Sequence, residues 1–140
     1  MIDPTLAFRT AVRAALMGAP AVTALVPADR IRAGSTRPGD AACIVLAGEQ
    51  IVFKGRASGE QFCASVYLDA HIWAPEGADL AHQIGGAAML ALLDAPTSEE
   101  IHVDEWTKPS IRYLRDPAPE RAWTHGVIEL EAAIRWRAYA

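Results

Sequence analysis

The sequence predicts a single α+β domain over residues 1–140, with a four-stranded antiparallel sheet and two helices packed on one face. Its length of 140 residues fits one domain, and its 51% hydrophobic and 21% charged residues are ordinary for a globular protein. The periodic segments follow the order helix, two strands, helix, two strands. Because hairpins join antiparallel neighbours, that order predicts two hairpins side by side with both helices on the apolar face.

The first helix is predicted to begin at Asp3-Pro4, an N-cap followed by proline at the first helical position, and to end at Gly18. Residues 19–26 suit one more short turn. Residues 28–40, rich in glycine, proline and arginine, are predicted to form a loop. The helix has an apolar stripe at helical spacing, made of Phe8, Val12, Ala15 and Leu16.

Residues 43–53 are predicted to form the first strand, and residues 54–60 a polar hairpin tip. Residues 61–73 then alternate with period two, which is a strong strand signal. One face of this strand carries Phe62, Ala64, Val66, Leu68, Ala70 and Ile72, and the other carries Cys63, Ser65, Tyr67, Asp69, His71 and Trp73.

The second helix is predicted over residues 78–93, with Pro96 closing it. Gly85 and Gly86 lie inside it and cost about 1 kcal/mol each relative to alanine, so we expect a close approach to the sheet or to a neighbour. Its apolar stripe consists of Leu80, Ile84, Ala88, Ala91 and Leu92.

The last third predicts a hairpin with arms over residues 99–114 and 121–139, the first of them bent at Pro109 and the tip at residues 116–119. Arms of about 15 residues span roughly 50 Å at ~3.3 Å per residue, more than a small core covers, so their ends should bend or project. On the final arm Ile128, Leu130, Ala132, Ile134 and Trp136 face one side, and Glu129, Glu131, Arg135 and Arg137 the other.

Charge and composition argue against several classes of function. The net charge of -4 argues against nucleic acid as the main ligand. The two arginine groups, Arg30, Arg32 and Arg37 and then Arg112, Arg115 and Arg121, read first as solvated loop residues. Two cysteines, Cys43 and Cys63, make no disulfide framework. With no signal peptide and no membrane-length apolar run, synthesis and folding in the cytoplasm are expected.

No catalytic motif is present: the sequence has no phosphate-binding glycine loop, dinucleotide fingerprint or nucleophile elbow, and no cofactor is implied. The best metal candidate is His102 with Asp104, joined by Asp69 and His71 if their strands are neighbours. A small metal-dependent or hydrolytic enzyme using this His/Asp face is the alternative function. The simpler interpretation is a polar sheet face, and the prediction is that the chain has neither a catalytic nor a metal site.

The second sheet face also carries aromatic residues. Tyr67, Trp73 and Trp106 are predicted to share it with acidic and histidine side chains. Aromatic residues among polar ones can mark an interface centre, but isolated surface aromatics need no explanation, so both interpretations stay open.

Three stretches together resemble a phage tail-completion family. They are "PAVTALVPADRI" at residues 20–31, "CASVYLDAHIWAP" running into "EGADLAHQIGGAAMLALLDAP" at 63–96, and "IRYLRDPAPERAWTHGVIELEAAIRW" at 111–136. Each is weak alone, but their order and spacing span nearly the whole chain. Ala118-Pro119 departs from the Asp-Gly turn expected at the last tip, and the 32–40 loop lacks the usual proline-aromatic entry.

The resemblance implies a tail terminator, or tail-to-head joining protein, of a phage or a phage-like gene transfer agent. Such proteins form rings, typically hexamers, that cap the tail tube, stop its polymerisation and face the neck, and DNA passes through the lumen. The implied partners are further copies of the chain, the tail tube protein and a head completion or neck protein, with no membrane. The protein would be cytoplasmic during assembly and then part of the particle's tail.

A subunit interface is accordingly predicted on the polar sheet face and the final hairpin, with a helix on the opposite side of the contact. A monomeric peptide-binding module using an open sheet edge is a third possibility. The residues expected at the interface are Tyr67, Trp73, Trp106, Arg112, Arg115, Arg121, Glu129 and Glu131.

Overall fold

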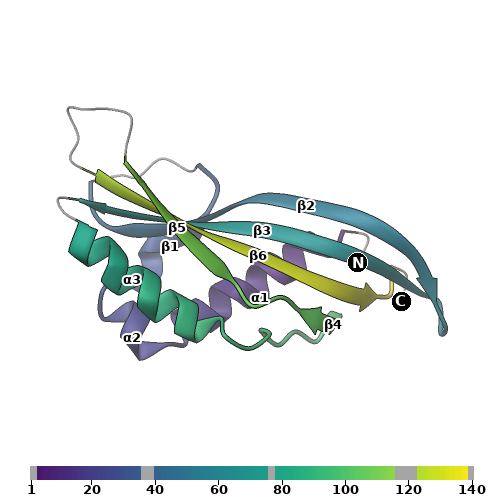
Figure 1. Cartoon of the computed structure of the whole chain (residues 1–140). Coiled ribbons are helices and arrows are strands. Elements are labelled where there is room, and N and C mark those ends of the chain that lie inside the picture. Colours follow the sequence, from purple (N-terminus) through teal and green to yellow (C-terminus); the bar gives the residue numbers. More distant parts are fainter. Residues whose placement is uncertain (1–2, 36–39, 76–77, 116–122, 139–140) are drawn as a thin grey trace.

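The computed structural model describes residues 3–35, 40–75, 78–115 and 123–138, and it shows an α+β domain built in two layers (Figure 1). A mixed sheet of six strands forms one layer, and three helices lie on one of its faces. The α+β class is therefore confirmed. The purely antiparallel sheet of four strands with two helices is wrong in its details.

The helices are α1 (Thr5–Met17), α2 (Pro20–Thr23) and α3 (Ala78–Ala91), with a 3₁₀ turn at Ala28–Arg30. The short α2 is the extra turn expected in residues 19–26. The strands are β1 (Ile31–Ala33), β2 (Cys43–Ala57), β3 (Gln61–Pro75), β4 (Ile101–Trp106), β5 (Ser110–Arg115) and β6 (Trp123–Trp136).

Two strands account for the difference from the expected sheet. β1 lies in the segment predicted to be a loop and pairs in parallel with Ile44–Leu46 of β2, because the fully buried Ile31 anchors it in the core. The first arm of the last hairpin is divided into β4 and β5, which pair with successive halves of β6. The break falls at residues 107–109, since Pro109 lacks the N–H that a continuous ladder needs.

Strand β6 lies in the middle of the sheet. It pairs with β3 along its whole length, from Phe62 opposite Trp136 to Pro75 opposite Trp123, and with β4 and β5 on its other side. The strand order is β1-β2-β3-β6-β4, with β5 also on β6. Figure 1 shows this strand running between β3 on one side and β5 and β4 on the other.

The period-two pattern correctly identifies the core face. Alternate residues of β3 and β6 point toward the helices and are almost fully buried, including Val66, Leu68, Ile128 and Ile134. The helices contribute their predicted stripes, which bury Phe8, Val12, Leu16, Ile84, Ala88 and Leu92. Burial of this apolar surface is the main stabilising contribution to the fold.

The β2–β3 hairpin extends past the helices and curves (Figure 1). Its tip is only residues 58–60, shorter than the expected 54–60, because β2 continues to Ala57. The pairing slips at two places in β2, where Gly48 and Gly55 have φ of 76° and 125°. Glycine adopts this backbone without strain, and such bulges bend a strand. We call residues 52–62, at the far end of this hairpin, the arm.

Helix α3 approaches the sheet closely at Gly85. The side chain of Tyr113 from β5 lies between Gly85 and Gly126 of β6, and a Cβ at Gly85 would overlap the Tyr113 hydroxyl and come within 2.7 Å of Ile111 Cδ1. One of the two helix glycines is therefore explained by contact with the sheet, as expected. Gly86 has no atom within 4 Å of a built Cβ in the described chain.

Candidate assembly interface

The face of the sheet away from the helices carries a shallow acidic groove. The register of β3 and β6 sets Tyr67 opposite Glu131 and Asp69 opposite Glu129, so these four side chains form one block. The groove has a volume of about 360 Å³. Its lining is completed by Gly48, Gln50, Thr107, Lys108, Ser110 and Leu130. The groove combines aromatic and acidic groups as the alternation predicts.

Charge in the groove is only partly balanced. The Arg112 guanidinium lies 3.7 Å from Glu129, and the Thr107 hydroxyl donates a hydrogen bond of 3.0 Å to Glu131. Burial raises the pKa of Asp69. His71 lowers this pKa, the Glu129 carboxylate raises it, and Arg112 lowers it. The carboxylates therefore repel one another in the isolated chain, and a cation from outside would relieve that repulsion.

Trp73 lies on the predicted face but is covered by its own chain. It is 4% exposed and forms a small second cluster with Cys43 and Val45, against which Trp123 packs. Its ring stacks on His125 at a centroid distance of 3.9 Å, and His125 Nε2 lies 2.9 Å from His71 Nδ1. Because a hydrogen bond between two imidazoles needs one donor and one acceptor, the pair holds only while at least one ring is neutral.

The histidine pair should make stability depend on pH. Burial lowers the pKa of His71 from 6.5, while Asp69 raises it and Arg112 lowers it. Because the pKa of His71 is lower in the folded chain, the unfolded chain binds a proton at His71 first as the pH falls below 6.5. The stability that neutral His71 contributes is therefore complete above pH 6.5 and is lost as the pH falls further. We expect His71→Gln to flatten the fall in urea-unfolding free energy between pH 7.5 and 5 relative to the wild type. An unchanged slope in His71→Gln would contradict this assignment.

Trp106 lies on the opposite face from the one predicted. The pairing of β4 with β6 slips between Val103 and Glu105, so the strand reverses its sides after this bulge. Trp106 therefore points toward the helices, where its ring meets Phe8 edge-on and its indole N–H donates to the Leu92 carbonyl at 3.0 Å. Its role in this chain is to join β4 to α1 and α3.

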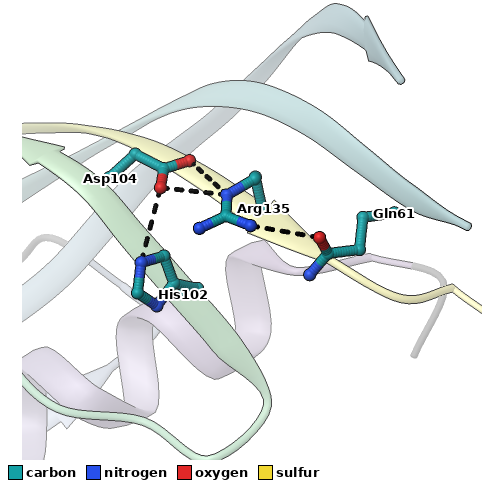
Figure 2. A network of polar contacts seen from close by, with 4 residues as sticks. All are labelled: Gln61, His102, Asp104 and Arg135. Carbon is teal, nitrogen blue, oxygen red and sulfur yellow. Dashed lines mark hydrogen bonds and ion pairs between the residues drawn. The ribbon is translucent and has the colours of Figure 1, made fainter. Parts of the chain in front are cut away.

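The His102 and Asp104 pair is engaged with an arginine (Figure 2). Arg135 Nε lies 2.9 and 2.7 Å from the two Asp104 oxygens, and its Nη1 donates to Gln61 at 3.1 Å. The hydrogen bond from Arg135 lowers the pKa of Asp104. Figure 2 shows these groups bridging β4, β6 and β3, so the Asp104 carboxylate already has a cation beside it.

The two candidate metal pairs do not meet. Asp69 and His71 lie on β3, His102 and Asp104 lie on β4, and β6 separates the two strands. His102 is level with Cys63 on β3, six positions from Asp69, which is about 20 Å along a strand. Within the described ranges no three His, Cys, Asp or Glu side chains are placed to hold a metal ion. The metal hypothesis required the strands of the two pairs to be neighbours, and they are not.

The structure thus gathers half of the predicted interface. Tyr67, Glu129, Glu131 and Arg112 lie together, whereas Arg115 is exposed farther along at the end of β5, opposite Thr124. Arg121 lies outside the described residues. Sequence reasoning missed His125, although the period-two pattern of β6 already places it on the face of Glu129. None of the helices in the described part of the chain is long and apolar enough to span a membrane.

Comparison with known proteins shows the family of the chain. No curated protein matches the sequence. Among solved structures, a chain in the virion of a native gene transfer agent particle has a similar fold, with a TM-score of 0.73, 15% sequence identity, and coverage of 96% of this chain and 99% of that one. The profile of the tail completion protein gp17 family matches residues 10–135. The chain therefore belongs to the tail completion protein gp17 family and is a structural protein of the phage tail.

Proposed function

We propose that this chain is the subunit of a ring that caps the tail tube, ends its polymerisation and joins the tail to the head or neck. Its partners are further copies of itself, six in the expected ring, together with the tube protein and a neck protein. DNA passes through the lumen as cargo. Membership of the tail completion family is the observation that carries this proposal.

The sheet offers two unlike open edges for such a ring. Among the described residues, β2 has no partner on its outer side beyond Leu46, and β4 and β5 have none on theirs. Exposed strand edges invite pairing with another chain. Because the two edges differ, a contact between them is head-to-tail, and such contacts close into rings when the rotation between copies allows it.

The charge of the chain suits a conduit for DNA. The net charge is -4, and the groove on the second face is acidic. A basic wall would hold phosphates by counterion release and slow the passage of DNA, whereas an acidic wall does not. The gene transfer agent chain of similar fold belongs to a virion, which supports a role inside an assembled particle.

Particles assembled without this chain should carry tubes of uncontrolled length that fail to join heads, because nothing ends polymerisation. Electron microscopy of tubes from a deletion strain measures both properties, and the purified protein added to tubes should appear as a terminal ring and restore joining. Tubes of normal length joined to heads in its absence would overturn the proposal.

A further inference from the structure

Three large apolar side chains mark two separate surfaces. Phe53 on the arm is 64% exposed, and Leu90 and Leu93 at the end of α3 are 75% and 47% exposed. Figure 1 places the arm and α3 at opposite ends of the molecule, so they do not meet within one chain. Single exposed apolar residues need no explanation, but each of these belongs to a larger group.

The arm presents an aromatic and basic surface on the helix side of the sheet. Phe53 and Phe62 both lie close to Trp136, each with a ring centroid 5.8 Å from it. The Arg56 guanidinium lies over the Phe62 ring, 5.5 Å from its centre, so the arm carries a positive charge next to its aromatic group. The indole N–H of Trp136 is buried, and no group in the described chain accepts its hydrogen bond.

The outer side of α3 presents a smooth apolar surface, which we call the α3 patch: Gly86, Leu90 and Leu93. These residues follow helical spacing and face away from the sheet. Gly86 costs the helix about 1 kcal/mol relative to alanine, and unlike Gly85 it faces open space. A glycine between exposed leucines leaves room for a large side chain from another molecule.

The charges of the two surfaces are opposite. The arm carries Lys54 and Arg56 against Glu60, and neither cation forms an ion pair within the described residues. The α3 segment, residues 78–100, contains no lysine or arginine and four carboxylates: Asp79, Asp94, Glu99 and Glu100. Lys108 of the same chain lies 3.6 Å from Asp94, whose side chain is still 92% exposed.

We propose that the arm of one copy binds the α3 patch of the next copy, with Phe53 packed at Gly86 and Leu90 and with Lys54 and Arg56 facing Asp94. The inference rests on the proposed ring and identifies its contact surfaces. The occupant is a second copy, because this chain supplies both complementary surfaces and cannot join them itself. The contact is head-to-tail, as a closed ring requires.

Engineered disulfides test which surfaces meet. In a Cys63→Ser background, which leaves only the buried Cys43, Phe53→Cys with Leu90→Cys should give on tubes a ladder of covalent oligomers that ends at the ring size. The matched control pairs Phe53→Cys with Thr10→Cys on the exposed side of α1 and should stay monomeric on a non-reducing gel.

Charge reversal gives a second readout that does not depend on cysteine. Arg56→Glu should weaken ring formation about tenfold, and Asp94→Arg in the same chain should restore it, because the pair is then reversed. Rings on tubes without a Phe53–Leu90 cross-link, or with a Phe53–Thr10 cross-link, would overturn the arm contact and leave the proposed function standing. Tubes that bear no ring in the wild type would overturn both.

Discussion

Replacing Gly85 by valine should lower the free energy of unfolding by about 3 kcal/mol, because the new side chain would overlap Tyr113 and Ile111. The Tyr113 ring also lies against Gly126, which limits how far it can move away from α3. Moving β5 away from α3 would instead open the core between helix and sheet. Urea denaturation followed by tryptophan fluorescence measures the change.

The matched control is valine at Gly86, one residue along the same helix. Nothing lies within 4 Å of a Cβ there, and valine is a better helix former than glycine, so stability should change by less than about 0.5 kcal/mol. Equal losses at both positions would show that the effect comes from the helix alone and not from the contact with Tyr113. Under the arm contact, Gly86→Val should impair ring formation while the monomer keeps its stability.

Trp106→Ala should cost about 2 to 3 kcal/mol of unfolding free energy, because its half-buried ring packs against Phe8 and its indole N–H satisfies the Leu92 carbonyl at the end of α3. Trp106→Phe keeps most of the packing and removes only the hydrogen bond, so it should cost about 1 kcal/mol. The measurement is again urea denaturation of the purified chain.

The two Trp106 variants also separate structure from assembly. If Trp106 acts within the chain, Trp106→Phe should form rings on tubes as the wild type does. A fully stable Trp106→Ala that fails to assemble would instead restore Trp106 to the interface predicted from the sequence.

The repeating patterns of apolar residues predicted the main strands and helices, because the buried side chains follow those patterns closely. The even positions of β3 and β6 alternate without interruption, and they are the buried ones from Ala64 to Ile72 and from Ile128 to Trp136. The apolar stripe of α3 was correct for the same reason. In both cases the buried side chains recur with the period of the strand or helix, so the sequence pattern is enough to predict which face is buried.

The errors arise where the backbone departs from that geometry. A single bulge at Asp104 reverses the sides of β4 and carries Trp106 to the other face, and nothing in the residue types marks the extra position. Strand β1 has only three residues, too few for alternation to show, and its pairing with β2 depends on the buried Ile31. A local pattern cannot report such distant pairing.

The interface was predictable only in part. Tyr67, Glu129 and Glu131 share a face because the two strands that carry them are regular. Strand order could not be deduced, so His102 and Asp104 were thought able to join Asp69, whereas β6 lies between them. The sequence predicted a hairpin tip at this end, but how far the arm extends beyond the core depends on where the helices end, which the pattern of residues 52–62 does not record.

The central position of β6 has a consequence for how the chain folds during synthesis. Until residues 123–136 leave the ribosome, β3 has a long open side and β4 and β5 have no strand to pair with. Long-range pairing of this kind is slow, and waiting strands are prone to aggregate. Overproduction should therefore favour inclusion bodies at high temperature, and slower translation or a holding chaperone should raise the soluble yield.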